Sequence, residues 1–317
     1  MENDEDIDAL MNSNWYNTQR PIVQEIIREL MIWSIQNAST LKATITISEQ
    51  QKQACFSIKE AHRYLDQPFL IIVENSDNDG NFLDAIFRCF PKHGSLILEH
   101  KEEGWLDYSL GGGSIIKNVI NAKMNALTSP IFTKEKSEYL HCFVLLDSDK
   151  KHPRMDLASD KKNIIAYLET HNIPYHILAK REMENYLPDE AIDTIPDNRD
   201  FIDAYLRLKP KQKDFFDLEK GFDRGRPFNS LIPQEVQDLY SDIGEHDKGV
   251  FRQQDLVSKY RNEGTTFKSG FPKLFHNGTV TKQTLLKRCA HHSSDPTIHP
   301  YNPKELPDLV EAIAKLL

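Results

Sequence analysis

Residues 69–74 read Phe-Leu-Ile-Ile-Val-Glu, five consecutive apolar residues followed by a carboxylate. An unbroken apolar run of this length is typical of a strand that is covered on both faces. A second run, Phe-Val-Leu-Leu at 143–146, has the same character and is followed by Asp-Ser-Asp at 147–149. The two runs predict the buried centre of a parallel sheet, with acidic residues directly after its strands.

Strand and helix patterns alternate around these two runs. Further strands are expected at 95–99 and 175–178, and helices at 81–90, 114–126 and 157–170. This alternation predicts an α/β fold, a mostly parallel sheet flanked by helices, over residues 66–190.

The regions on either side have mainly helical patterns. In residues 1–65 the sequence predicts an acidic tail, helices at 21–35 and 51–64, and a short strand at 44–48. Beyond the sheet, helical segments are expected at 198–208, 211–219, 233–241, 253–262, 282–290 and 304–317. We therefore divide the chain into an N-terminal helical region (1–65), a sheet domain (66–190) and a C-terminal mostly helical region (191–317).

The composition favours a soluble cytoplasmic protein with no membrane association. Of the 317 residues, 39% are hydrophobic, enough for a core, but no apolar run approaches the roughly 18 residues of a membrane helix. The acidic N-terminus lacks the apolar stretch of a signal peptide. Four widely separated cysteines exclude a CxxC zinc site.

The net charge of −9 argues against a protein that coats nucleic acid by bulk attraction. Five of the acidic residues lie within the first eight positions, which leaves −4 for residues 9–317. Residues 251–292 carry a local charge of +6, and their centre interleaves Lys268 and Lys273 with aromatic residues. These two lysines are candidate nucleic-acid contacts, unless the aromatics are core residues that the lysines merely cover.

Acidic residues follow three of the expected strands. They are Glu74 with Asp77 and Asp79, then Asp147 with Asp149, then Glu182 with Glu184. Because the carboxyl ends of parallel strands share one edge of a sheet, these carboxylates should meet and repel one another unless a cation neutralises them. Oxygen ligands favour Mg²⁺ or Mn²⁺, so the pattern predicts a divalent-metal site. Taken singly, each residue is better explained as a solvated cap or turn former, but three strand ends acting together favour the metal site.

The order of these motifs resembles the TOPRIM domain of topoisomerases, primases and OLD-family (overcoming lysogenization defect) nucleases. The resemblance is carried by Glu74, by the pair Asp147 and Asp149, and by the glycines at 111–113 between them. Residues 181–187, Arg-Glu-Met-Glu-Asn-Tyr-Leu, resemble the R-E-[IL]-E-N-Y-L segment of the OLD family, and residues 213–221 resemble what often follows it. Asn75 departs from the family pattern E-G-x-x-D, so the second acid of the first loop is either Asp77 or Asp79.

The resemblance, over about residues 66–221, implies a Mg²⁺- or Mn²⁺-dependent nuclease with two ions. Asp147 and Asp149 would be the primary ligands, joined by Asp79, and Glu74 would complete their shell or accept a proton from water. Glu184 would hold the second ion, with Glu182 as the alternative. The cations that contact phosphate would come from Lys150, Lys151, Lys180 and Arg181.

The glycines at 111–113 are not a nucleotide-binding P-loop, because no Gly-Lys-Ser/Thr follows them. The resemblance therefore implies a separate ATPase subunit of the ABC or AAA type and a role in anti-phage defence. Two rival functions remain: a non-catalytic interaction subunit with a decayed site, and a HAD-like phosphatase with Asp147 as nucleophile and Asp149 as acid. The choice between DNA and RNA and the oligomeric state, including a homo-oligomer, stay open.

Overall fold

The structure, a computed structural model, describes residues 4–37, 46–48, 55–112, 115–222, 233–259, 267–289 and 302–317. It contains two compact units, Met1–Ile58 and Lys59–Leu317. In the first unit lie α1 (Asp4–Met11), α2 (Asn14–Asn17) and α3 (Pro21–Asn37), and α3 confirms the helix predicted at 21–35. In the predicted strand at 44–48, Ile47 makes only an isolated bridge with Phe56, and residues 44 and 45 lie outside the described part.

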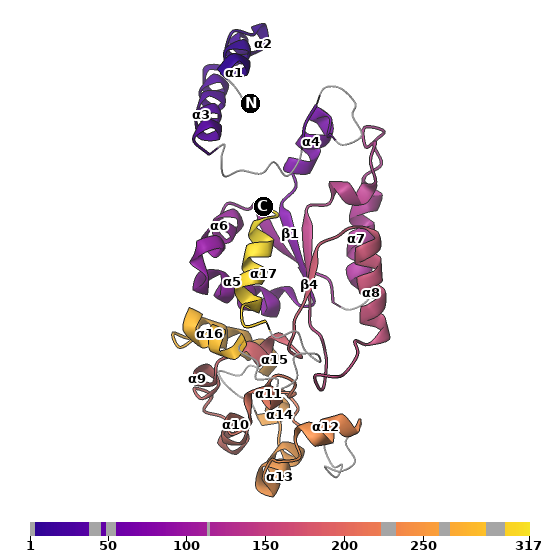
Figure 1. Ribbon diagram of the computed structural model, residues 1–317, viewed down its shortest axis with the longest axis vertical. Helices are drawn as coiled ribbons and strands as arrows, with labels where there is room; N and C mark the ends of the chain where they lie inside the picture. Colours follow the sequence, from indigo (N-terminus) through magenta and orange to yellow (C-terminus); the bar gives the residue numbers. More distant parts are fainter. Residues whose placement is uncertain are drawn as a thin grey trace. The chain divides into compact units, whose positions relative to one another are not determined.

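The second unit is built on a four-stranded parallel sheet, which confirms the predicted α/β fold (Figure 1). Its strands are β1 (Phe69–Val73), β2 (Leu106–Leu110), β3 (Cys142–Leu146) and β4 (Tyr175–Ile177), in the order β2-β1-β3-β4. The strand predicted at 95–99 is wrong, because these residues belong to α6 (Pro91–Glu102). A short apolar run fits a helix as well as a strand, and the true edge strand, Leu-Asp-Tyr-Ser-Leu, is too polar to have been recognised.

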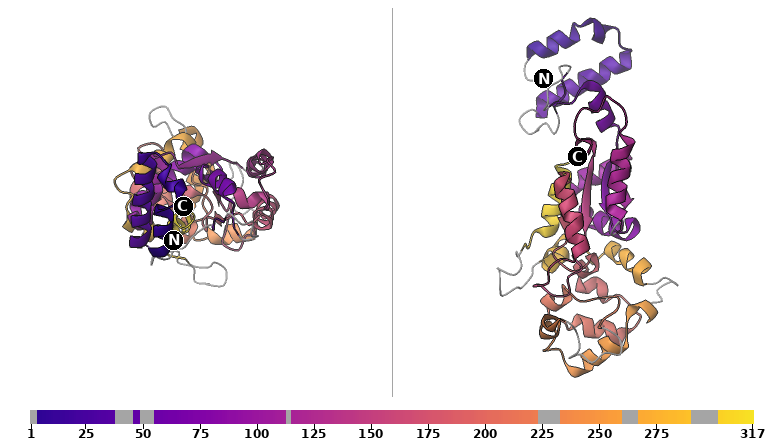
Figure 2. Two further views of the ribbon diagram at one scale, coloured as in Figure 1. Left: turned by 90° about the horizontal axis from the view of Figure 1, so that it is seen from above. Right: turned by 90° about the vertical axis from the view of Figure 1, so that its right-hand side faces the viewer.

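Helices cover both faces of the sheet (Figures 1 and 2). On one face, Ile71 and Val73 of β1 pack with α5 (Ser76–Cys89), α6 and α17 (Glu305–Ala314). On the other face, Ile72 packs with α7 (Ile115–Ala126) and α8 (Ser159–Thr170). Alternate residues of one strand thus enter two different cores, which is why the strand sequence is apolar throughout.

The helices after residue 188 belong to one compact unit with the sheet, and most of them pack on the first of these two cores. They are α9 (Asp189–Ile192), α10 (Arg199–Leu206), α11 (Pro210–Lys213), α12 (Gln234–Leu239), α13 (Glu245–Gln253), α14 (Leu256–Lys259), α15 (Phe267–Gly270) and α16 (Lys282–Cys289). The boundary predicted at 190/191 therefore lies inside a compact unit. The helix predicted at 211–219 is shorter than expected and ends at Lys213.

The strand order creates a crevice at one edge of the sheet. From β1 the chain crosses to β2 on one side, and it then returns to β3 on the other side of β1. Ligands of open parallel sheets bind at such a reversal, beyond the carboxyl ends of the strands. Within the described ranges, no helix has the length and apolar character needed to cross a membrane.

Candidate metal centre

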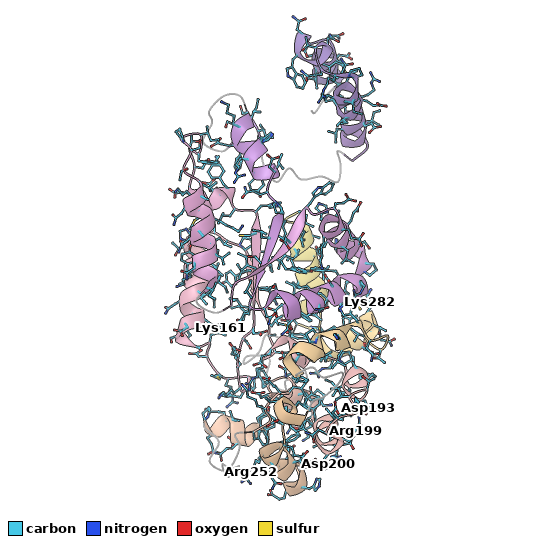
Figure 3. The ribbon with its side chains drawn as sticks, turned by 180° about the vertical axis from the view of Figure 1, so that it is seen from behind. Lys161, Asp193, Arg199, Asp200, Arg252 and Lys282 are labelled. Carbon is cyan, nitrogen blue, oxygen red and sulfur yellow. The ribbon has the colours of Figure 1, made fainter. Side chains whose placement is uncertain are left out.

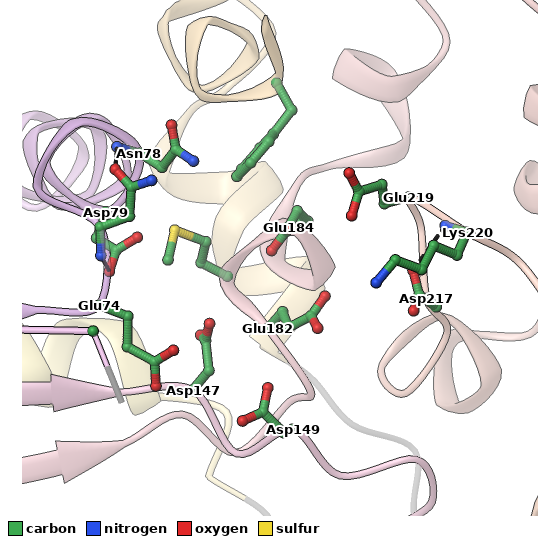
Figure 4. Close-up of a pocket in the computed structure, with 14 residues that line it drawn as sticks. Glu74, Asn78, Asp79, Asp147, Asp149, Glu182, Glu184, Asp217, Glu219 and Lys220 are labelled. Atoms are coloured by element: carbon green, nitrogen blue, oxygen red, sulfur yellow. Dashed lines mark hydrogen bonds between the residues drawn. The ribbon is translucent and has the colours of Figure 1, made fainter. Parts of the chain in front are cut away.

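A pocket of about 340 Å³ lies where β1 and β3 end, and its lining is strongly acidic (Figure 4). Eight carboxylate residues line it: Glu74, Asp79, Asp147, Asp149, Glu182, Glu184, Asp217 and Glu219. Figure 4 shows Glu74, Asp147 and Asp149 on one side and Asp217 and Glu219 on the other, with Glu182 and Glu184 between them. The acidic residues predicted from three strand ends thus gather around one cavity.

The loop after β3 is attached to the segment after β4 by hydrogen bonds. The buried Ser148 donates its hydroxyl to the carbonyl oxygen of Lys180 (2.6 Å), and the Asp149 N–H donates to that of Arg181 (2.9 Å). Asp149 adopts a left-handed conformation with φ of 53°, which Asp tolerates better than most residues. The anchored loop places the carboxylates of Asp147 and Asp149 at the pocket.

Residues 181–187 are attached in turn to residues 213–217. The fully buried Asn185 side chain donates to the carbonyl oxygens of Lys213 (2.8 Å) and Phe216 (2.9 Å) and accepts the N–H of Glu182 (2.9 Å). Arg181 adds an ion pair with Asp217 (2.7 Å between Nη2 and Oδ2). These contacts explain how the Glu-Met-Glu stretch and the Asp217–Glu219 stretch line the same pocket.

Negative charge in the pocket is poorly compensated. Burial, together with repulsion from Glu184, Asp79 and Glu74, raises the pKa of Asp147 well above its ordinary value. The Asp147 Oδ1 atom is buried and has no hydrogen-bond partner. Burial and repulsion from Glu182 raise the pKa of Glu184 to about 8. Such a site favours a cation, because a cation would stabilise the ionised form of every one of these groups.

The first acidic loop contributes Asp79 to the pocket. Asp79 is 3% exposed, and its Oδ2 accepts the N–H of Asn75 (3.0 Å), the residue that departs from the family pattern. Burial, with repulsion from Glu74, raises the pKa of Asp79 to about 7 despite this hydrogen bond. The side chain of the alternative, Asp77, lies outside the described residues.

The glycine loop packs closely against this first turn. The Gly111 N–H donates to the carbonyl oxygen of Val73 (2.7 Å), and a Cβ at Gly112 would lie 3.0 Å from the carbonyl oxygen of Glu74. Gly112 also lines the pocket. Gly113 and Ser114, predicted to complete the loop and to cap the next helix, lie outside the described part of the chain.

The donor set suits a hard divalent ion, because every acidic residue that lines the pocket offers oxygen ligands. However, no three His, Cys, Asp or Glu side chains of the described residues lie close enough together to hold an ion as they stand. Lys161 lies in the first turn of α8 (labelled in Figure 3), and its ammonium contacts two of these carboxylates: its Nζ is 3.0 Å from Glu74 Oε1 and 2.6 Å from Asp149 Oδ2. Binding an ion would therefore require these side chains to move.

The structure places Lys180 where it cannot contact a substrate. Its side chain is fully buried and forms an ion pair with Asp214, which also binds Arg288 (3.2 Å). Burial, together with repulsion from Arg288, lowers the pKa of Lys180 to about 8, although Asp214 acts to raise it. Lys180 therefore has a structural role in the core and is not part of the pocket lining. The prediction that it contacts phosphate does not fit this buried position.

The other predicted cations also lie outside the pocket lining. Arg181 is paired with Asp217 and Glu182, Lys150 is half-buried, Lys151 and Lys273 are exposed, and the side chain of Lys268 is outside the described residues. The phenylalanines that flank Lys268 and Lys273 are buried at 0–2% exposure, so they are core residues and cannot stack on bases. Among the described residues that line the pocket, Lys220 is the one cation.

Sequence reasoning missed four residues of the site. Asp217, Glu219 and Lys220 lie in the stretch 213–221. This stretch resembles a segment of the OLD family, but the sequence predicted no function for its residues. Lys161 is an ordinary lysine in a helix whose neighbours in sequence are polar, and no local signal marks it.

Comparisons with protein-family models, with curated proteins and with solved structures found no match for this chain. The similarity to TOPRIM and OLD-family proteins therefore rests on the order and spacing of the motifs in the sequence.

Proposed function

We propose that this chain is a metal-dependent endonuclease that hydrolyses phosphodiester bonds in DNA or RNA. The observation that carries the proposal is the convergence of carboxylates from three strand ends on one pocket, around the buried and unpartnered Asp147 Oδ1. Carboxylates gathered in this way are costly to a fold unless they serve to bind a cation.

The pocket offers two groups of ligands, in keeping with two ions. One ion would be held by Glu74, Asp147 and Asp149 together with Asp79. The second ion would be held by Glu184, with Glu182 as the alternative ligand. A bound Mg²⁺ or Mn²⁺ would neutralise phosphate charge and activate a water molecule. Glu74 would alternatively accept the proton of that water, and Lys220, which lines the pocket, would contact a phosphate oxygen.

The direct test is incubation of the purified chain with plasmid DNA and with total RNA, in Mg²⁺, in Mn²⁺ and in EDTA. Cleavage should require the divalent ion and should fall by at least about a hundredfold in Asp147→Ala and Glu74→Ala. Asp193→Ala, an exposed acidic residue of the helical region, serves as the control. Unchanged metal-dependent cleavage in a folded Asp147→Ala protein would refute the proposal.

A non-catalytic interaction subunit is the second candidate. It is favoured by Asn75 in the first loop and by the separation of the carboxylates of the described residues. Calorimetric titration with Mn²⁺ separates the two, because an intact site binds the ion and a decayed site does not.

We further propose a cytoplasmic setting in anti-phage defence with a separate ABC- or AAA-type ATPase. The support is the resemblance to OLD-family proteins together with the absence of a Walker motif in this sequence. A net charge of −9 and an acidic pocket imply weak affinity for nucleic acid, so delivery or activation by a partner is expected. Stimulation of cleavage by the partner and ATP would support this setting.

A further inference from the structure

Lys161 is a buried lysine whose three ammonium hydrogens all have acceptors at the edge of the metal pocket. Its side chain is 10% exposed. The Nζ atom lies 3.0 Å from Glu74 Oε1 and 2.6 Å from Asp149 Oδ2, and it also donates to the carbonyl oxygen of Asp147. Because an ammonium has three N–H donors, this cation is fully satisfied by one residue from the end of β1 and two from the end of β3.

The acceptors of Lys161 include the carboxylates proposed to hold a divalent ion. Burial opposes the charge of Lys161, but Glu74 and Asp149 outweigh it and raise the pKa of the ammonium. A single positive charge does not partner every carboxylate oxygen here, because the buried Asp147 Oδ1 atom has no hydrogen-bond partner. The lysine and a divalent ion would therefore compete for the same oxygens, and a doubly charged ion would neutralise more of the pocket.

We propose that Lys161 is an exchangeable counter-ion: its ammonium holds Glu74 and Asp149 in place until a divalent ion binds, and then withdraws from them. The inference rests on the proposed function, since it requires these carboxylates to bind the ion. The flexible four-carbon stem of lysine permits such a withdrawal from its fixed point on α8. Lys161 thus stabilises the pocket before an ion binds and sets the ion concentration that is needed for binding.

The test compares wild type with Lys161→Met, which keeps the stem and removes the charge. Calorimetric titration with Mn²⁺ should show roughly tenfold to a hundredfold tighter binding in Lys161→Met, because the competing charge-assisted bonds are gone. In EDTA the same variant should unfold at a lower temperature than wild type, and Mn²⁺ should raise its melting temperature by more. Lys161→Arg, which keeps the charge, should resemble wild type.

Lys162→Met is the matched control, because Lys162 is the next residue of α8 and its side chain is 54% exposed in an ion pair with Asp156. It should change neither Mn²⁺ affinity nor stability in EDTA. If Lys161→Met does not fold, Lys161→Gln, which retains hydrogen bonding without charge, takes its place with the same expectation.

The outcomes distinguish this inference from the function on which it rests. If wild type and Lys161→Met both bind Mn²⁺ and the variant binds equally or more weakly, the exchange is overturned while the metal site stands. If neither protein binds Mn²⁺, the proposed metal site itself is overturned. Binding by the variant that is tighter than wild type and is lost in Asp147→Ala supports both.

Discussion

Asp214→Ala is expected to destabilise the sheet-containing unit by about 3–5 kcal/mol, because it removes the shared partner of two buried cations. Asp214 is 2% exposed, and its Oδ1 accepts from Lys180 Nζ and from Arg288 Nη2 (3.2 Å). Lys180 is fully buried and Arg288 is 7% exposed. Without the carboxylate, neither charge can be solvated by water, and this desolvation accounts for the magnitude of the loss.

The assay is urea and thermal unfolding of the full chain, followed by circular dichroism. At about 2–4 °C per kcal/mol for a unit of this size, the melting temperature should fall by roughly 6–20 °C. Asp193→Ala is the matched control: Asp193 pairs with Arg199 at 2.8 Å (Figure 3), but the side chains are 60% and 41% exposed. An exposed pair is worth about 0–1 kcal/mol, so this control should unfold near the wild-type temperature.

A second variant tests the cause of the loss. Adding Lys180→Met to Asp214→Ala removes one of the two unpaired charges and should recover part of the stability. A loss below about 1 kcal/mol in Asp214→Ala, equal to that of Asp193→Ala, would refute the claim that the two buried cations depend on Asp214 for their stability.

Two further outcomes follow from the packing and charge of the same unit. The folded-state pKa of Glu184, about 8, lies above the ordinary 4.5, so its proton stabilises the fold at low pH and this contribution is lost as pH rises through 8. Glu184→Gln should therefore raise the melting temperature in EDTA at pH 9 and flatten its dependence between pH 6 and 9; an unchanged pH profile would contradict this. Gly94→Ala should cost at least about 1–3 kcal/mol in urea unfolding, because its Cβ would lie 2.0 Å from the carbonyl oxygen of Phe87 where α6 meets α5. Gly249→Ala, in a helix with open space around the new Cβ, should instead stabilise by up to about 1 kcal/mol, and equal losses in the two variants would rule out the clash.

The sequence by itself determined the centre of the sheet and the edge at which the acidic residues gather. A parallel strand covered on both faces must be apolar throughout, so the unbroken apolar runs at 69–73 and 143–146 were enough to predict these two strands. The residues directly after such strands lie at one edge by topology, which brought Glu74, Asp147 and Asp149 together. Where burial is partial, as in β2, the local signal fades, and a helix at 95–99 was mistaken for a strand.

Only the tertiary structure decided which charged groups face the pocket and which are buried behind it. The sequence predicted Lys180 as a phosphate contact and gave Lys161 no role, yet Lys180 is paired with Asp214 in the core and Lys161 with Glu74 and Asp149 at the site. The partners of both lysines lie far along the chain, and the energy of a buried charge depends on those partners and not on its sequence neighbours. Asp217 likewise lies at the site because of long-range contacts, which attach residues 213–217 to the loop after β4 and which its sequence neighbours do not reveal.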